Sequence, residues 1–291
     1  MYHIALLTSQ DFPVLTVSDR KLIPELLTLG NMAEAVVWDE PDVNWINYDA
    51  LIFRSTWDYF TKQDVFFVWI EDLKRKNIIT FNPLVVIKKN AHKFYLQEME
   101  SSGIKIIPSV FIPRSENIDI DTLIPYEWKK VVIKPAVSAG SYLTELFDRS
   151  ESDFVSDRYT KIIKDHDMII QKFIPEIQTP GEISMVFFDK KFSHSVIKTP
   201  KAGDFRIQSQ FGGQYVSYTP SDLLVKIGTQ IVESVKEDLL YARVDGVLIH
   251  DEFHLMELEL IEPDLYMDYL PDGQNTFSKV IKEYLDNRLK T

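Results

Sequence analysis

A lysine followed by small residues is the first pattern in this sequence that could perform chemistry. Lys134 ends an apolar segment, and the run Ser138-Ala139-Gly140-Ser141 follows it. Small side chains let backbone N–H groups approach phosphate oxygens, and the lysine ammonium adds a point charge. The pattern indicates a phosphate-binding loop, although an ordinary hairpin with a surface lysine fits these residues equally well. It is not a Walker loop, because its lysine precedes the small residues.

Three carboxylates near the C-terminal end form a second group. Glu257 and Glu259 stand two residues apart on an expected strand, so they share one face of the sheet. Asp245 joins them if segment 243–250 pairs antiparallel with segment 255–261. Like charges on one face repel each other, and Mg²⁺ held between carboxylates and nucleotide phosphates would explain them. The alternative, a solvent-facing strand, fits less well because apolar residues of the hairpin suit an interior position.

Two weaker patterns surround these. Lys198 and Arg206 stand near the glycines Gly203, Gly212 and Gly213. A basic pair followed by glycine turns suits a triphosphate or an acyl-phosphate oxyanion, and a bland surface loop is equally plausible.

The segment Gln171-Lys172-Phe173-Ile174 reads as an extended linker, and Glu182 follows it. Such a linker can offer its backbone to an adenine edge, while a nearby acid can bond ribose hydroxyls.

A further polar group follows an early buried strand. Arg54, Ser55, Trp57 and Asp58 come after segment 50–53, at the strand end where open α/β sheets bind ligands. An arginine can grip a carboxylate, and an aspartate can pair with an ammonium. Together they suit an amino-acid-like zwitterion, with Trp57 as an apolar wall. The alternative is a structural Arg54–Asp58 salt bridge.

The elements that position these residues fall into two parts. In the first 86 residues, apolar strands alternate with amphipathic helices, which predicts a small open parallel α/β sheet. The rest is predicted to be antiparallel-rich α+β. Strands are expected at 4–8, 35–38, 50–53, 78–81, 110–112, 130–134 and 168–173, with hairpins at 183–188/193–198 and 243–250/255–261. Helices are expected at 19–29, 66–76, 90–101, near 118–123, and at 152–164, 222–240 and 275–290.

Composition excludes several classes of function. The net charge is −12 without a basic run, so we expect no nucleic-acid partner. There is no cysteine, which excludes thiol catalysis and disulfides. No segment approaches the roughly 18 to 20 apolar residues of a membrane helix, and no signal peptide is recognisable. We therefore expect a cytoplasmic protein without a nucleic-acid or membrane partner.

The order of these features resembles the ATP-grasp superfamily across nearly the whole chain. Bacterial glutathione synthetase and the ribosomal-protein glutamate ligases are similar, and the O-ureido-serine cyclo-ligases of cycloserine biosynthesis look closer still. The resemblance implies an N-terminal acceptor-side domain (1–86) and an ATP-grasp domain (87–291) with a lid (roughly 104–172) and a C-terminal subdomain (roughly 173–291). The segments that carry it are Trp38-Asp39, Phe53–Tyr59, Lys134–Gly140, Gly181–Ser184 and Glu257–Pro263.

The resemblance also implies how a nucleotide would be held. Lys93 and Lys134 would contact the α- and β-phosphates, and the loop Ser138–Ser141 would close over the β/γ end. The linker 171–174 would hold adenine by its backbone, with Glu182 on the ribose.

The same resemblance implies the catalytic machinery. Arg206 would stabilise the transferred phosphoryl group and the tetrahedral intermediate, with Lys198 as the other catalytic cation. Asp245, Glu257 and Glu259 would hold two Mg²⁺ ions. Many members of the superfamily have Asn where this chain has Glu259, so the metal dependence could differ.

These expectations converge on an ATP-dependent carboxylate–amine ligase. It would form an acyl phosphate on an amino-acid-like or small peptide substrate and release ADP and phosphate. Two alternatives stay open: a cyclo-ligase that forms an amide within one substrate, and a non-catalytic nucleotide-binding regulator. Relatives often form dimers or tetramers, so a homo-oligomer is also admitted.

Overall fold

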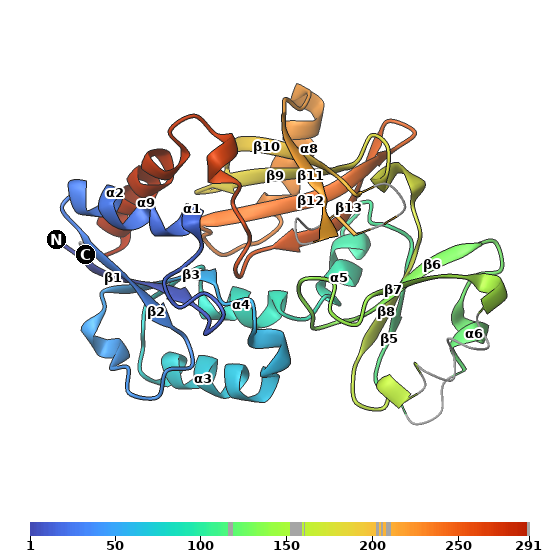
Figure 1. The fold of residues 1–291 in the computed structure, drawn as a ribbon, viewed down its shortest axis with the longest axis horizontal. Coiled ribbons are helices and arrows are strands. Elements are labelled where there is room, and N and C mark those ends of the chain that lie inside the picture. The colour runs from blue at the N-terminus through green and yellow to red at the C-terminus, as the bar shows by residue number, and fades with distance from the viewer. Residues whose placement is uncertain are drawn as a thin grey trace.

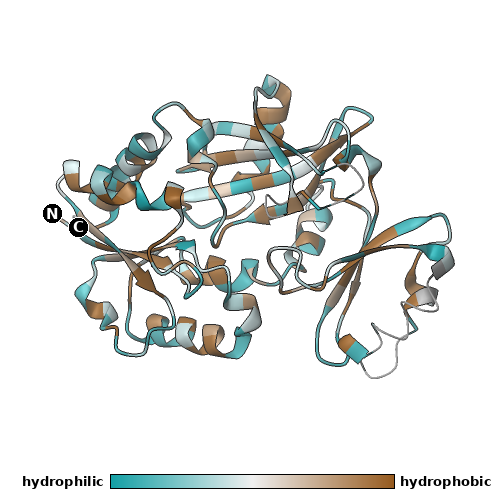
Figure 2. Ribbon diagram, in the orientation of Figure 1, coloured by the Kyte–Doolittle hydropathy of each residue, from teal (hydrophilic) through white to brown (hydrophobic). Residues whose placement is uncertain are grey.

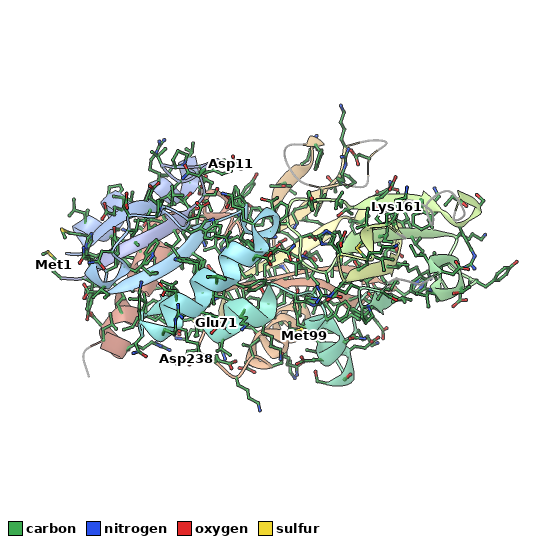
Figure 3. The ribbon with its side chains drawn as sticks, turned by 90° about the horizontal axis from the view of Figure 1, so that it is seen from below. Met1, Asp11, Glu71, Met99, Lys161 and Asp238 are labelled. Carbon is green, nitrogen blue, oxygen red and sulfur yellow. The ribbon has the colours of Figure 1, made fainter. Side chains whose placement is uncertain are left out.

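The computed structural model describes residues 1–115, 119–151, 159, 161–201, 204, 206–207 and 211–289. In this part of the chain, three sheets follow one another along the long axis of the molecule. The N-terminal sheet lies at one end, a four-stranded sheet at the other, and a five-stranded sheet between and above them (Figure 1). Met1 and Lys161 lie towards these opposite ends (Figure 3). Among the described helices, none is both long and apolar enough to cross a bilayer.

The N-terminal sheet is parallel, with strand order β2-β1-β3-β4, as the alternation of elements predicts. Ile4 and Leu6 of β1 enter a core shared with α9, whereas Ala5 and Leu7 enter the core under α3. Burial on both faces is typical of parallel sheets and explains the continuous apolar runs, which are brown in Figure 2. The strands are β1 (His3–Thr8), β2 (Met32–Val37), β3 (Ala50–Ser55) and β4 (Thr80–Phe81).

The helices of this part include one interruption. The helix expected at 19–29 is divided at Lys21 into two shorter helices. The helical elements are α1 (Val17–Arg20), α2 (Leu22–Thr28), α3 (Gln63–Arg75) and the 3-10 turns η1 (Trp45–Asn47) and η2 (Tyr59–Thr61).

The five-stranded sheet is antiparallel, with order β11-β10-β9-β12-β13. Its two hairpins turn through Asp189-Lys190 and His250-Asp251, all four with positive φ, as two-residue hairpin turns require. The helix expected at 222–240 ends earlier, at Glu233. The elements are β9 (Glu182–Phe188), β10 (Lys191–Thr199), β11 (Gln214–Tyr218), β12 (Tyr241–Ile249), β13 (Glu252–Glu259), α8 (Asp222–Glu233), α9 (Gly273–Leu289), η4 (Pro175–Ile177) and η6 (Met267–Tyr269).

The four-stranded sheet is also antiparallel, in the order β5-β8-β6-β7, and has its own apolar core. Its strand β7 was not expected from the sequence. The helix expected near 118–123 begins outside the described residues, and most of the one expected at 152–164 lies outside them. The elements are β5 (Ser109–Ile112), α6 (Ile120–Leu123), β6 (Lys130–Pro135), β7 (Glu145–Asp148), η3 (Arg149–Glu151) and β8 (Met168–Lys172).

The connection between β4 and β5 differs from the expected helix at 90–101. Two helices occupy it, α4 (Leu84–Asn90) and α5 (Tyr95–Ser101), with residues 91–94 between them. The backbone N–H of Lys93 donates to the Ala136 carbonyl at 2.9 Å rather than to the preceding helical turn. The interruption therefore ties Lys93 to the segment that follows β6.

Candidate active site

A cavity of about 600 Å³ opens where the three sheets meet. Its walls are the segment after β3, the loop after β6, the linker after β8 and one face of the five-stranded sheet. Most of the residues selected from the sequence line it, although they are far apart in the chain. They are Trp57, Lys93, Lys134, Ser138, Ala139, Gly140, Ser141, Gln171, Lys172, Phe173, Ile174, Glu182, Lys198, Arg206, Asp245, Glu257 and Glu259.

Opposite charges alternate across the sheet face that borders the cavity. Lys198 lies opposite Glu182 in register, and their side chains form an ion pair of 2.5 Å. Asp245 accepts a hydrogen bond from the Ser184 hydroxyl and lies 3.7 Å from the Lys198 ammonium. Burial alone would lower the pKa of Lys198, but Asp245 and Glu182 outweigh it and raise that pKa. At Glu182 burial prevails over the Lys198 charge and raises the carboxyl pKa.

Arg243 belongs to this site although the sequence reasoning gave it no role. It precedes Asp245 by two residues on β12, so both side chains point to the same face. Its Nε lies 3.0 Å from both Asp245 carboxylate oxygens, and a terminal nitrogen lies 2.5 Å from Glu259. The guanidinium carbon is 5.2 Å from the centre of the Tyr266 ring. The two-residue spacing to Asp245 is the sequence signal that could have identified it.

Glu257 and Glu259 reach the cavity from β13, and each is engaged by a cation. Glu257 pairs with Lys93 at 3.1 Å. Burial would raise the pKa of Glu257, but Lys93 and Lys134 outweigh it and lower that pKa. For Glu259, burial prevails over Arg243 and raises the pKa to about 8. Within the described ranges, no three His, Cys, Asp or Glu side chains are grouped so that they could hold a metal ion.

The strand β13 is the outer strand of its sheet. Side chains from α4 and α5 form hydrogen bonds with its free edge. The Tyr95 hydroxyl donates to the Leu258 carbonyl at 3.0 Å and accepts from the Leu258 N–H at 2.9 Å. Asn90 donates to the same carbonyl at 2.8 Å and accepts from the Leu260 N–H at 2.9 Å. Because Leu258 stands between the two glutamates, these bonds fix the backbone that carries both acids.

The loop after β6 is held by Lys93 and has a strained backbone. The Lys93 ammonium donates to the Ser138 carbonyl at 2.5 Å. Gly140, Ser141 and Leu143 have φ of 59°, 64° and 48°. A left-handed conformation costs a residue other than glycine about 1 to 2 kcal/mol. Strain of this kind gathers in ligand-binding segments.

Lys134 lines the cavity beside this loop. Its ammonium has no hydrogen-bond or ion-pair partner among the described residues. Burial lowers its pKa, and the neighbouring Lys93 adds to this effect against the attraction of Glu257. A cation removed from water without a partner is unfavourable, and a bound anion would relieve that cost.

The linker after β8 follows the cavity wall. The N–H groups of Lys172 and Phe173 donate, each at 2.9 Å, to carbonyl oxygens of neighbouring segments. The Gln171 amide donates to the Ser109 hydroxyl at 3.0 Å. Among the described residues, no acceptor bonds the Ile174 N–H, so this group is the linker donor available to a ligand.

Arg206 lines the cavity from a loop that is described only in part, since Gly203 and Phe205 lie outside the described residues. Its guanidinium pairs with Asp204 through three contacts of 3.1, 3.3 and 2.8 Å. The pair Gly212-Gly213, expected at the substrate site, is not part of the cavity lining in the described chain.

Arg54 and Ser55 lie in the interior and do not line the cavity. Arg54 is fully buried and forms an ion pair of 2.9 Å with Asp19. It also donates to the Pro263 carbonyl at 3.0 Å, and Ser55 donates to the same Asp19 at 3.1 Å. This differs both from the expected substrate grip and from the alternative Arg54–Asp58 salt bridge. The reason is that β3 is buried to its last residue, where Asp19 from α1 is the acid within reach.

Asp58 is also engaged away from the cavity. It accepts from the Trp38 indole N–H at 2.7 Å and pairs with Lys62 at 2.7 Å. Trp57 does line the cavity, and its indole N–H donates to the Glu262 carbonyl at 2.9 Å. Of the residues expected at the substrate site after β3, the structure therefore brings Trp57 alone to the cavity.

The fold and this cavity define the class of protein. The model of the family described as "Prokaryotic glutathione synthetase, ATP-grasp domain" matches residues 93–263, more than half of the chain. The chain therefore belongs to this ATP-grasp family, and it is an ATP-dependent carboxylate–amine ligase. The match confirms the fold class, the enzyme class and the use of ATP that were expected from the sequence.

Individual relatives refine the comparison. A second family model, "D-cycloserine synthetase DcsG, N-terminal domain", matches residues 4–82. The chain is 24% identical to cycloserine biosynthesis protein DcsG of Streptomyces lavendulae, over 91% of this chain and 92% of that protein.

Two solved structures share the fold. The crystal structure of D-cycloserine synthetase DcsG is 21% identical, with a TM-score of 0.85 over 97% of this chain and 99% of that one. D-alanine–D-alanine ligase of Bacillus anthracis is 14% identical, with a TM-score of 0.70 over 100% and 98%.

Proposed function

We propose that the protein activates the carboxylate of an amino-acid-like or small peptide substrate as an acyl phosphate and joins it to an amine, releasing ADP and phosphate. The observation that carries the proposal is Lys134, a half-buried cation without a hydrogen-bond or ion-pair partner among the described residues, beside a strained small-residue loop and in the same cavity as three acids. The names of the relatives, a cycloserine biosynthesis protein and a D-alanine–D-alanine ligase, support an amino-acid-like substrate.

The nucleotide would lie between the loop after β6 and the linker after β8. Lys134 and Lys93 would contact its phosphates, because both ammonium groups border the loop Ser138–Ser141. The Ile174 N–H would bond the adenine edge, and Glu182 would accept from the ribose.

The acids on the sheet suit Mg²⁺, because carboxylate oxygens are the ligands it takes together with substrate phosphates. In the described chain these acids are bonded to Arg243 and Lys93 and are not grouped as a ready metal site. Asp245, Glu257 and Glu259 would hold two such ions after giving up part of those bonds. Bound Mg²⁺ would neutralise charge as one anion attacks another.

The protein's own cations would do the rest by position. Arg243 and Lys198 are buried, held by opposite charges, and therefore pre-oriented towards an oxyanion. Arg206 is more exposed, and its bonds among the described residues are to Asp204 of its own loop, so it would reach the transferred phosphoryl group by releasing Asp204.

The proposal is tested with a panel of the L- and D-amino acids and simple dipeptides, measuring ADP and phosphate release. One member or pair is expected to drive stoichiometric release of both with formation of an amide. Absence of ADP release across the whole panel would instead favour a non-catalytic nucleotide-binding regulator.

A cyclo-ligase is a second candidate, favoured by the match of residues 4–82 to the D-cycloserine synthetase N-terminal domain. It would use the same nucleotide site but close an amide within one molecule. O-ureido-serine supplied alone would then be converted to a cyclic amide, with one ADP and one phosphate released per molecule consumed. Turnover that requires a separate amine would exclude this candidate. Sedimentation analysis of the same preparation would show whether a homo-oligomer is formed.

A further inference from the structure

One acid that lines the cavity has no role in the proposed mechanism. Glu262 follows β13 and lines the cavity. In the described chain its carboxylate has neither a hydrogen-bond donor nor an ion-pair partner, although its carbonyl accepts from Trp57. The acids Glu257 and Glu259 differ, because Lys93 and Arg243 neutralise them.

The other cations of the cavity do not complete this carboxylate. Lys198 is committed to Glu182 and Arg206 to Asp204. Lys134 and Lys172 belong to the four-stranded sheet, on the side of the loop and the linker. Burial and the neighbouring Glu259 raise the pKa of the Glu262 carboxyl to about 8, so its charged form is disfavoured in the empty cavity. A cationic group of a ligand would stabilise that charged form.

The surroundings of Glu262 indicate which kind of cation fits. Trp57 is bonded to its backbone, and the buried Tyr59 lies within electrostatic reach of its carboxylate. Phe12 packs edge-on against Trp57 at 5.1 Å between ring centres, and all three rings line the cavity. Aromatic walls attract ammonium groups, whereas Mg²⁺ requires about six oxygen ligands.

We infer that Glu262 binds the ammonium group of the amino-acid-like substrate, with Trp57 and Tyr59 as the adjoining wall. The inference rests on the proposed function and names the residue that would select an amino-bearing substrate. It replaces Asp58, which the structure engages with Trp38 and Lys62. An ammonium has three N–H donors and no acceptor, so a carboxylate is the partner that satisfies it best.

The test compares Glu262→Gln, which keeps the side-chain size and removes the charge, with the wild-type enzyme. The probe is the amino acid with the highest kcat/KM in the panel described above. A lost charge-assisted bond should raise its KM at least about 10-fold, while kcat and the Kd of AMPPNP with Mg²⁺ change less than about 2-fold. Glu262→Asp, which retains the charge, should recover part of the affinity.

Two controls make the result specific. Asp268→Asn removes an exposed acid of the same stretch, paired with Lys21 outside the cavity, and should leave KM unchanged. The des-amino analogue of the probe should bind wild type and Glu262→Gln alike in calorimetry, since neither complex contains the contact.

The outcomes separate this inference from the function on which it rests. Turnover with an unchanged KM in Glu262→Gln, or an equal loss of affinity for the amino acid and its des-amino analogue, would overturn the role of Glu262 alone. If no amino acid or dipeptide drives turnover in the wild type, the proposed function and this role fail together. A Glu262→Gln protein that does not fold would assign the residue to stability and also overturn the inference.

Discussion

Lys134 is expected to lower the stability of the nucleotide-free protein and to contribute to nucleotide binding. Its half-buried ammonium has no partner among the described residues, so replacing it with an apolar side chain of similar length should not destabilise the fold. We expect Lys134→Met to keep or raise the Tm without nucleotide. The increase in Tm caused by AMPPNP and Mg²⁺ should largely disappear, because a phosphate contact worth about 10-fold in affinity is lost.

Thermal unfolding with and without nucleotide measures both effects. Lys130→Met is the matched control, since Lys130 is an exposed residue on the same strand and does not line the cavity. Unchanged nucleotide stabilisation in Lys134→Met would remove this residue from the phosphate site.

The acids on β13 should not contribute equally to metal binding. Glu257→Gln should lower kcat by at least about 100-fold, because loss of a metal contact is worth several kcal/mol of charge stabilisation. Glu259→Asn restores the residue common in the superfamily and should be milder. The measurement is kcat as a function of Mg²⁺ concentration, with Glu252→Gln, an exposed acid of the same strand, as control. A dead Glu259→Asn beside an active Glu257→Gln would reverse the assignment.

At the scale of single residues, most of those selected from type, spacing and the family resemblance line the cavity. The two-residue spacing of Glu257 and Glu259, and the small residues after Lys134, reflect backbone periodicity and loop sterics. The polar cluster after β3 failed for a different reason. Sequence placed Arg54 and Asp58 at the correct strand end but could not reveal that Asp19 and Lys62 engage them first. Partners distant in the chain leave no periodic signal.

At the scale of elements, the outer strand β13 depends on hydrogen bonds from side chains of α4 and α5. Tyr95→Phe removes one hydroxyl that serves both the N–H and the carbonyl of Leu258. The Leu258 carbonyl still accepts from Asn90, but the Leu258 N–H is left without its acceptor, which costs about 1 to 3 kcal/mol. We expect this loss in free energy of unfolding, together with a lower kcat, because the adjacent glutamates lose their support.

Urea denaturation and steady-state kinetics test this prediction. Tyr126→Phe removes the hydroxyl of an exposed tyrosine, 89% accessible, and should change neither quantity. A Tyr95→Phe variant with lowered stability but wild-type kcat would show that the bonds support the fold without positioning the acids.

Helices and strands were predicted where one pattern of apolar residues continued along the whole segment. The two hairpins of the five-stranded sheet followed from alternating side chains, and the parallel sheet from continuous apolar runs. The helix expected at 90–101 was wrong in its first turn, because the Lys93 N–H bonds to Ala136 across the molecule. A tertiary bond of this kind overrides local helical pattern.

At the scale of the whole molecule, buried polar groups join the N-terminal sheet to the five-stranded sheet. The Asn82 amide donates to the carbonyls of Tyr241 and Leu260 at 2.9 and 2.7 Å and accepts from the Leu240 N–H at 2.8 Å. The Tyr241 hydroxyl of β12 reaches the Phe53 carbonyl of β3 at 2.9 Å. The sequence indicated two parts but could not indicate this junction. The division at residue 86, and the lid at 104–172, stay predictions.

A second and much smaller contact joins two walls of the cavity. Phe60 of η2 packs against Tyr142 of the loop after β6, with ring centres 5.1 Å apart. Tyr142 is 41% exposed, so the contact contributes little to overall stability. Because it joins the acceptor side to the phosphate loop, it is placed to hold that loop closed over a water-sensitive acyl phosphate.

Phe60→Ala should therefore loosen the loop without unfolding the protein. An aromatic pair is worth about 0.5 to 1.5 kcal/mol, so we expect a roughly 2- to 12-fold loss in kcat/KM for ATP, with a nearly unchanged Tm. The share of ATP hydrolysed without amide formation should rise, because water reaches the acyl phosphate. Tyr142→Ala should act alike, and the double variant should be no worse than either single one if the two rings act only through each other. Additive losses, or coupling of ATP to product as tight as in the wild type, would show that this aromatic contact does not close the site.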